Sequence, residues 1–439
     1  MNSLLTRLQE ITTEFTILPE QIHTIANTFH QTMLAGLAGT HSSLKMLPSY
    51  ISKPSRDETG IFLALDFGGT NVRVLVTELL GQGHYTIHAH IASPLKDKNG
   101  QYNYISEQST ADQLFDFIAT KIATLVTPNA IYPLGHTFSF PTNQTALNRS
   151  TLLYWTKEIA TKGVEGQDIT ELLTAALRRK HLTNVVPQAI INDTVGTLLA
   201  AAYTDQSTSI GSICGTGHNT AYIEPCAPCT GKPMIINLES GNFDQLPVTC
   251  YDKQLDHDSE KPGSQQLEKM VSGHYIGELI RIIICSLLNE GLFANCDTVP
   301  LTKPYTLTGA HLSLFLQDTS TTYMSINSFL ENTLHIIGST ALDRRILKDI
   351  ATLVSTRSAR LVAATYIGIL HHIDPTLSQN HKIAIDGSLY EKTPGYADII
   401  QATLAQGLDA QKVTTTLIKD GSGIGAAIAT AIAVQSDHY

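Results

Sequence analysis

Apolar residues recur along the chain at two different spacings, and these spacings predict where helices and strands lie. Over residues 1–50 they recur every three to four positions, as in LLTRLQEI and IHTIANTFHQTMLAGL, which predicts amphipathic helices. Residues 61–65 and 72–76 are short β-rich runs on either side of DFGGTN. The chain is therefore expected to open with two helices, followed by a strand, a glycine turn and a returning strand.

The same strand and turn pattern occurs again further along. The run VVPQAII ends at Asn192 and Asp193 and passes into TVGTLLAAAY, which predicts a strand followed by a helix. SIGSICGTGHNTAYIE then repeats the strand, glycine turn and strand of the first hairpin. Two such hairpins in separate segments, with no long linker between them, predict a duplicated α/β core.

Composition narrows the class of protein. The 439 residues suffice for two or three domains of about 150 residues. A net charge of −10 argues against a broad basic surface for nucleic acid or an anionic membrane. Arg7 and Glu10 interrupt the apolar start, and no apolar run approaches the roughly 18 residues that span a bilayer. We expect a cytoplasmic protein without nucleic-acid or membrane partners, whose six cysteines are reduced thiols.

Three glycine turns are candidates for phosphate binding. They are residues 66–71 (DFGGTN), 215–219 (GTGHN) and 420–425 (DGSGIG). Glycines let backbone N–H groups approach a phosphate, and Thr70, Thr216 and Ser422 add hydroxyl donors. A carboxylate beside such a turn suits magnesium. One such turn alone is more often a tight hairpin, but three in an acidic chain favour a nucleotide site.

Other nucleotide motifs are excluded by their context. Gly231 and Lys232 are followed by Pro233 and cannot complete a Walker A loop. The DFG triplet that begins at Asp66 has no H-R-D-x-x-x-x-N loop to accompany it, so it is not that of a protein kinase. DGSGIG lies too near the C-terminal end for a dinucleotide-binding βαβ unit.

Asp193 has two interpretations. An aspartate between a strand and a helix is most often an N-cap that accepts backbone hydrogen bonds. Alternatively, it is a general base at the carboxyl end of a strand, where open α/β sheets bind their ligands. The residues around it leave both open.

Two further features are given structural interpretations. Cys226 and Cys229 form a C-x-x-C, but no second pair stands at zinc spacing, so we interpret them as two thiols in a loop. Trp155, the only tryptophan, is expected in the core.

Taken together, the segments resemble the hexokinase family of the eukaryotic type. They are LKMLPSYISKP, LALDFGGTNVRVL, LGHTFSFP, WTKEI, INDTVGTLLAA, GTGHNTAYIE, KPGSQQLEKMVSGHYIGE, AIDGSLY and DGSGIGAA, and they run from about Leu44 to Ala427. The resemblance implies an α/β, two-domain actin-like ATPase (ribonuclease H-like) fold with a duplicated core and an interdomain cleft. The large domain would comprise residues 1–60 and 194–422, and the small domain residues 61–193 and 423–439.

The resemblance also implies roles for individual residues. Asp193 would be the catalytic base, assisted by Lys157. The sugar contacts would be Ser139, Phe140, Thr156, Lys157, Asn192, Asp193, Asn219, Glu239, Gln265 and Glu268. ATP would lie along Asp66, Gly68, Gly69, Thr70, Asn71, Arg73, Gly215, Thr216, Gly217, Gly273, Gly387, Ser388, Gly421 and Ser422, with Mg²⁺ held near Asp66 through water.

The implied activity is transfer of the γ-phosphoryl group of ATP to the primary hydroxyl of glucose and other hexoses. This reaction gives hexose 6-phosphate and ADP, the first step of glycolysis. A hexose sensor without turnover is the alternative, and an actin-like chaperone or filament ATPase leaves TFSFP and WTK unexplained. Departures from the family pattern at Ser150, Glu158, Ile159, Ser240, Asn242 and His274 leave the preferred sugar open. Whether the protein is a monomer or a homodimer is also open.

Overall fold

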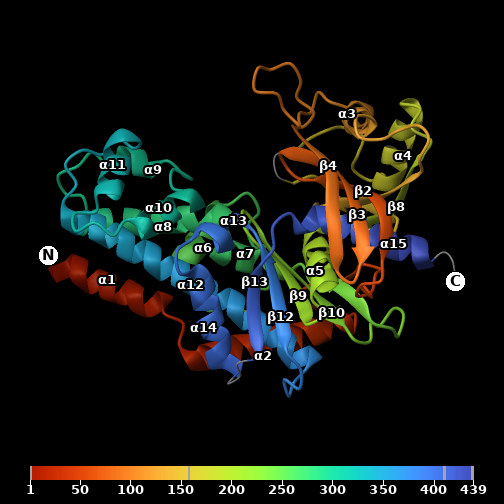
Figure 1. Cartoon of the computed structure of the whole chain (residues 1–439). Helices are drawn as coiled ribbons and strands as arrows, with labels where there is room; N and C mark the ends of the chain where they lie inside the picture. The colour runs from red at the N-terminus through yellow and green to blue at the C-terminus, as the bar shows by residue number, and fades with distance from the viewer. Residues whose placement is uncertain (1, 157–158, 409–411, 437–439) are drawn as a thin grey trace.

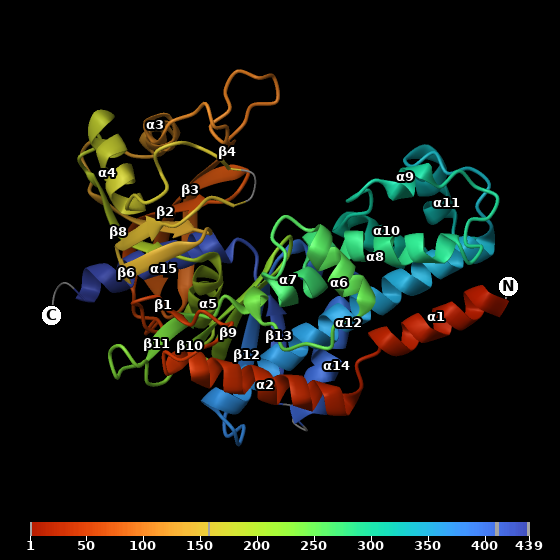
Figure 2. The same ribbon diagram turned by 180° about the vertical axis from the view of Figure 1, so that it is seen from behind.

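The computed structural model describes residues 2–156, 159–408 and 412–436. Two β-sheets form its centre, each covered by helices, and Figures 1 and 2 show them in neighbouring lobes. The leading helices predicted from the apolar spacing are confirmed as α1 (Asn2–Phe15) and α2 (Pro19–Leu37). Both belong to the lobe of the larger sheet, where their apolar residues join one hydrophobic core.

The smaller sheet has five strands. In spatial order they are β4 (His84–Pro94), β3 (Asn71–Gly81), β2 (Thr59–Phe67), β5 (Tyr132–Phe138) and β8 (Val185–Ile191). β2, β3 and β4 pair antiparallel, whereas β5 runs parallel to both β2 and β8. Leu63 and Leu65 of β2 pack into one core cluster and Phe62 and Ala64 into another, so both faces of this central strand are buried.

The larger sheet repeats this arrangement with one added edge strand. In order it contains β1 (Leu47–Pro48), β11 (Met234–Asn237), β10 (His218–Glu224), β9 (Thr208–Cys214), β12 (His381–Asp386) and β13 (Val413–Leu417). β9, β10 and β11 pair antiparallel, and β12 runs parallel to β9 and β13. The two sheets therefore share one strand order and direction, which confirms the duplicated core.

Helices cover both sheets and extend the larger lobe. On the smaller lobe lie α3 (Ala111–Ala123) and α4 (Ile169–Arg179), with the ribbon of β6 (Thr142–Ala146) and β7 (Arg149–Leu152). The remaining helices of the larger lobe are η1 (Ser240–Asn242), α6 (Cys250–Asp258), α7 (Gln266–Val271), α8 (Gly273–Leu288), α9 (Val299–Thr302), α10 (Gly309–Gln317), α11 (Met324–Asn332), α12 (Ala341–Ile373), α13 (Ser388–Lys392) and α14 (Tyr396–Leu408). Among the described residues, no helix has the length and apolar character needed to cross a bilayer.

Two helices join the sheets. α5 (Asp193–Thr204) packs on β9 and β10, whereas α15 (Gly421–Ser436) packs on β2, β5 and β8. The helices cross where Gly196 faces Gly425, and a Cβ on Gly425 would lie 2.2 Å from the Gly196 carbonyl oxygen. Two of the predicted domain boundaries, 193/194 and 422/423, fall at the starts of these helices, and the third, 60/61, falls within β2. The division into domains stays a prediction.

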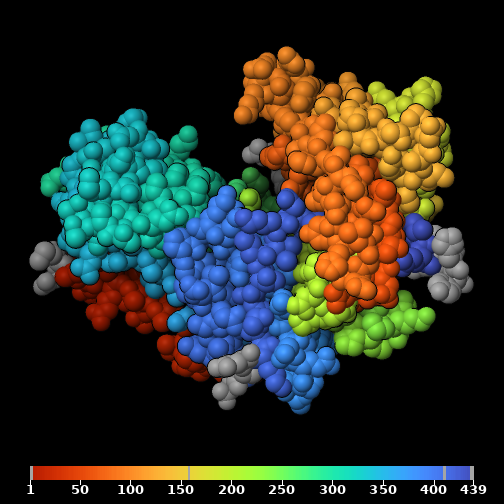
Figure 3. Space-filling model, viewed as in Figure 1, coloured from red at the N-terminus to blue at the C-terminus, as the bar shows by residue number. Residues whose placement is uncertain are grey.

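The two lobes leave a hollow between them. In the space-filling view a notch separates the lobe of α3 and α4 from that of α8 to α11 (Figure 3). Together with the duplicated sheets, this arrangement agrees with the two-domain actin-like fold expected from the sequence.

The close helix crossing yields a test of the packing. Gly425→Ala is expected to destabilise the protein by about 2–3 kcal/mol, because its Cβ would meet rigid backbone. Gly423→Ala, on the same helix, is the control, since its Cβ would meet only the flexible end of Leu75 at 3.0 Å. Alanine is otherwise the better helix former, so the control should be neutral or slightly stabilising. Denaturant unfolding measures both, and equal effects would contradict the crossing.

Candidate active site

The buried carboxylate of Asp66 connects the first glycine turn to the third through hydrogen bonds. Asp66 is the second-to-last residue of β2 and is only 6% exposed. Its Oδ2 accepts hydrogen bonds from Arg73 Nη2 at 2.6 Å and from Ser422 Oγ at 3.0 Å. Arg73 also forms an ion pair with Asp420. Burial raises the pKa of Asp66, and Arg73 opposes this shift. Segments more than 350 residues apart in sequence thus meet at one carboxyl group.

The first turn itself is a tight connection between β2 and β3. The Gly68 N–H donates to the Asn71 carbonyl at 3.1 Å, and Asn71 Nδ2 donates to Thr70 Oγ1 at 3.1 Å. Thr70 is exposed, whereas Gly68 and Gly69 are half-buried. The hairpin interpretation is therefore confirmed, and contact with phosphate stays a prediction.

The second turn rests against the start of α8. Within the turn, the Gly215 N–H donates to the Gly217 carbonyl at 3.0 Å. The Gly273 N–H donates to the Gly215 carbonyl at 2.8 Å, and the His274 N–H to that of Thr216 at 3.0 Å. These backbone bonds bring together the predicted nucleotide residues of two separate segments.

The loop between β12 and α13 completes this second group. Gly387 has a φ of +126°, and a Cβ there would lie 2.4 Å from the Cys214 carbonyl oxygen. Only glycine fits such a close approach without strain. Ser388, which begins α13, is exposed. The loop therefore packs directly beside the second turn.

Asp386, which the sequence analysis did not select, joins the two groups. Burial raises the pKa of Asp386 to about 6, with further contributions from the negative charges of Asp420 and Asp193. The backbone N–H groups of Gly387 and Gly421 favour the charged form of its carboxyl group and so oppose this rise in its pKa. The structure thus gathers carboxylates from β2, β12, α5 and the start of α15 around one place. The sequence signal was a carboxylate at a strand end followed directly by glycine.

The structure bears on the two interpretations of Asp193, because the residue before it is the N-cap. The N-cap of α5 is Asn192, whose Oδ1 accepts the Thr194 N–H at 2.9 Å and the Thr194 hydroxyl at 2.6 Å. Asp193 is the first residue of the helix, and its own Oδ1 accepts the Thr194 N–H at 2.9 Å. The principal capping role therefore belongs to Asn192.

A network of amides and a carboxylate extends from this helix start across the larger sheet. Asn219 Nδ2 donates to Asn237 Oδ1 at 2.9 Å and to Glu239 Oε1 at 3.2 Å. Asn237 Nδ2 donates to the same Glu239 oxygen at 2.9 Å, and Thr194 Oγ1 lies 3.5 Å from Asn237 Oδ1. Asn237, a second residue that the sequence analysis missed, therefore connects the predicted sugar residues. Its signal was a polar side chain at the end of the buried strand β11.

Glu268 joins this region from α7. Its Oε2 accepts the His218 N–H at 2.9 Å, and a Cβ on Gly241 would lie 3.1 Å from the Glu268 Cβ. Because Gly241 is close to Glu239 in the chain, the two predicted sugar carboxylates are brought near each other. Gln265 is the N-cap of α7 and has a left-handed backbone with a φ of 53°.

The sugar contacts predicted for the smaller lobe lie in or beside a cluster of aromatic side chains. Phe140 is 5% exposed and packs with ring centroids 4.8 Å from Phe138 and 5.0 Å from Trp155. Its side chain is thus a core element, and Trp155 is half-buried on the same core, as expected. Ser139 and Thr156 flank the cluster and are half-buried. Lys157 lies outside the described residues.

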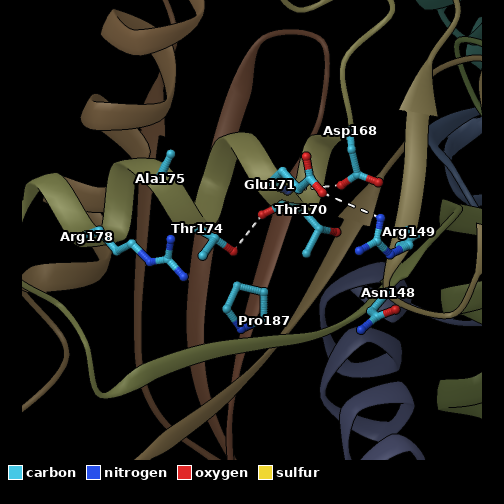
Figure 4. Close-up of a pocket in the computed structure, with 9 residues that line it drawn as sticks. All are labelled: Asn148, Arg149, Asp168, Thr170, Glu171, Thr174, Ala175, Arg178 and Pro187. Atoms are coloured by element: carbon cyan, nitrogen blue, oxygen red, sulfur yellow. Dashed lines mark hydrogen bonds and ion pairs between the residues drawn. The ribbon is translucent and has the colours of Figure 1, made fainter.

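A separate hollow of about 460 Å³ lies in the smaller lobe beside α4 and the edge strand β8 (Figure 4). Arg178 extends from α4 on one side, and Arg149 approaches Glu171 at 3.5 Å on the other. Pro187 lines it from the first half of β8, whereas Asn192 follows the far end of that strand. None of the predicted site residues lines this hollow.

The fold and the joined glycine turns define a two-domain kinase of the actin-like class. Family models described as hexokinase match residues 7–203 and 209–432. The chain is 36% identical to Hexokinase-2 of Solanum tuberosum, with 93% of this chain and 87% of that protein covered. Hexokinase-4, chloroplastic, of Oryza sativa subsp. japonica is 35% identical, with 93% and 84% covered.

A solved structure agrees with these sequences. Hexokinase from Schistosoma mansoni complexed with glucose superposes with a TM-score of 0.85 at 33% identity, covering 98% of this chain and 99% of that one. The chain belongs to the hexokinase family. It is an enzyme of the class that phosphorylates hexoses with ATP in glycolysis.

The raised pKa of Asp386 predicts a pH-dependent stability. An aspartate with a pKa of 3.8 when unfolded and about 6 when folded favours folding below pH 4, and this contribution is lost as the pH rises to 6. Asp386→Asn cannot ionise, so its stability relative to the parent should increase by about 2–3 kcal/mol between pH 4 and 7. Unfolding at several pH values measures this difference, with exposed Asp398→Asn as the control. A difference that does not change with pH would refute the shift.

Proposed function

We propose that this enzyme transfers the γ-phosphoryl group of ATP to the primary hydroxyl of glucose and other hexoses, with Asp193 as general base. The observation that carries the proposal is the start of α5. Asn192 caps that helix, so Asp193 is not needed as its cap. Asp193 acts electrostatically on the carboxyl group of Asp386. The next residue, Thr194, contacts Asn237 of the network that includes Glu239. A base in this position would have a sugar on one side and phosphate on the other.

The sugar would be held by the amides and carboxylates of the larger lobe. Asn219 and Glu239 present a donor and an acceptor side by side, which suits neighbouring sugar hydroxyls. Gln265 and Glu268 would contact further hydroxyls from α7. The contributions proposed for the smaller lobe are those of Ser139, Phe140, Thr156, Lys157 and Asn192. Because the Phe140 side chain is packed in the core, we propose that it contacts sugar only through its backbone.

The phosphates of ATP would lie across the joined glycine turns. The proposed residues are Gly68, Gly69, Thr70, Asn71 and Arg73 of the first turn, Gly215, Thr216 and Gly217 of the second, and Gly273, Gly387, Ser388, Gly421 and Ser422 around them. Backbone N–H groups and the Arg73 guanidinium would neutralise charge that develops in transfer. Phosphoryl transfer needs positioning more than covalent chemistry, so no covalent enzyme intermediate is proposed.

The carboxylates beside these turns fit a magnesium ion. In addition to burial, repulsion by Asp193 and Asp420 raises the pKa of Asp386, so the charges of these three carboxylates act on one place. Hard cations in phosphate sites take one or two carboxylates and keep water. We propose that Asp66 and Asp386 hold Mg²⁺ through water, where the ion would neutralise phosphate oxygens. Arg73 and Ser422 already occupy Asp66 Oδ2, which favours an indirect contact.

The reaction is tested by measuring ADP release with ATP and magnesium against glucose, fructose, mannose, galactose and N-acetylglucosamine. Release that depends on one or more hexoses is expected, and binding without turnover would favour a sensor. We further propose a cytoplasmic protein, either a monomer or a homodimer. Because one relative is named as chloroplastic, fluorescence imaging of the tagged full chain in its own cells is the appropriate test.

Asp193→Ala is expected to lower kcat by at least about 10²-fold, the typical effect of losing a general base, while sugar and ATP still bind. The melting temperature should change little, because Asn192 caps α5. The matched control is Asp168→Ala, which removes the N-cap of α4. That control should lower stability by about 1 kcal/mol and leave kcat intact. The reverse pattern for Asp193→Ala, a lower melting temperature with normal kcat, would exclude it as the base.

Glu239→Ala and Glu268→Ala are expected to weaken sugar binding. Each variant would leave sugar hydroxyls without a charged acceptor, at a cost of about 1.5–3 kcal/mol, or roughly ten- to a hundredfold in affinity. Calorimetry with glucose measures the loss, and Glu260→Ala, an exposed residue on the loop before α7, is the control. Unchanged affinity in both variants would remove these carboxylates from the sugar site.

A further inference from the structure

The loop between β10 and β11 carries two exposed cysteines that the kinase reaction does not use. Cys226 and Cys229 lie on the segment after Glu224, and both are exposed. In Figures 1 and 2 this loop extends outward from the edge of the larger sheet, away from the notch between the lobes. Solvent and small solutes can therefore reach both thiols.

The loop contains a single turn of chain that includes Cys229 and directly follows Cys226. The Ala227 carbonyl accepts the N–H groups of Thr230 at 3.1 Å and Gly231 at 2.7 Å, the pattern of a single helical turn. Ala227 itself is fully buried and anchors the turn. Only two residues separate Cys226 from Cys229 in this short loop, and a disulfide needs their Cβ atoms about 3.5–4.5 Å apart. The exposed loop has to bring the two thiols to this separation for the bond to close.

Contacts at the two ends of the loop leave this adjustment possible. The Cys226 N–H donates to Glu224 Oε1 at 3.2 Å, and Cys229 Sγ makes a long contact of 3.9 Å with Met234 Sδ. A movement of the loop does not need to break a strand pair, because β10 ends at Glu224 and β11 begins at Met234. Within the described residues no group of three or more His, Cys, Asp or Glu side chains is arranged to hold a metal. Two thiols alone suit a disulfide better than a metal site.

The other four cysteines differ from this pair. Burial raises the pKa of Cys214 to about 11, and it also raises the pKa of Cys285 and of Cys296. A raised pKa lowers the thiolate fraction, and the thiolate is the reacting form. Cys250 is exposed but has no cysteine near it in the sequence.

We propose that Cys226 and Cys229 form a reversible dithiol–disulfide couple that exchanges with small-molecule disulfides such as oxidised glutathione. One thiolate attacks a glutathione sulfur, which forms a mixed disulfide and releases one glutathione thiolate. The second thiolate then attacks the protein sulfur of the mixed disulfide and releases the second glutathione. The protein loses two electrons and two protons, and the small disulfide is reduced to two thiols. The couple acts independently of phosphoryl transfer.

The test incubates the reduced full chain with oxidised glutathione at pH 8, blocks remaining thiols with N-ethylmaleimide and maps the peptides by mass spectrometry. An internal bond between Cys226 and Cys229 should form more than about tenfold faster than any oxidation at Cys214, because Cys214 is buried and the two loop cysteines are exposed. Dithiothreitol should restore both thiols.

Single variants distinguish formation of the internal disulfide from independent reaction of two exposed thiols. Cys229→Ser should retain glutathione on Cys226, and Cys226→Ser should retain it on Cys229, because neither has a second thiol to release it. Cys250→Ser is the control and should close the bond like the parent. If the parent instead accumulates glutathione on both cysteines, or if neither reacts faster than Cys214, the proposal is wrong.

Discussion

The contact between α5 and α15 is the constraint on which the rest of the molecule depends. These helices cross between the two sheets with Gly196 and Gly425 in backbone contact, a separation that no larger residue permits. Their closeness fixes the smaller sheet against the larger one. It also fixes the starts of both helices, so that Asp193 and Ser422 come to the same region. The carboxylates of the site gather there because the two helices cannot separate without losing this packing.

Duplication explains why the site forms between the halves rather than within one. Each sheet has the same strand order, and each contributes a carboxylate at a strand end, Asp66 from β2 and Asp386 from β12. The backbone N–H groups of Gly387 and Gly421 favour the charged form of Asp386, and Asp66 accepts hydrogen bonds from Arg73 and Ser422. Each carboxylate therefore takes partners from distant segments. Neither half alone contains the full arrangement.

Local patterns in the sequence predicted much of this, and contacts between distant segments account for what they missed. The helices at the start, both hairpins and the turn at Gly68 follow from spacing and glycine content within short windows. Asn237 and Asp386 were missed because their importance comes from partners far away in the chain. The sequence also did not show which of Asn192 and Asp193 caps α5, because asparagine and aspartate are equally favoured at an N-cap. The structure shows that Asn192 is the cap.

The starts of α5 and α15 have one more consequence. Every α-helix carries a partial positive charge of about half a unit at its amino end, from N–H groups without a partner in the helix. The amino ends of both helices face the place where the aspartates gather. Two helix dipoles thus oppose part of the repulsion among those carboxylates before any ion or nucleotide arrives. The same two dipoles would favour an incoming anion, so a single helix crossing both assembles the acidic groups and makes their surroundings more receptive to phosphate.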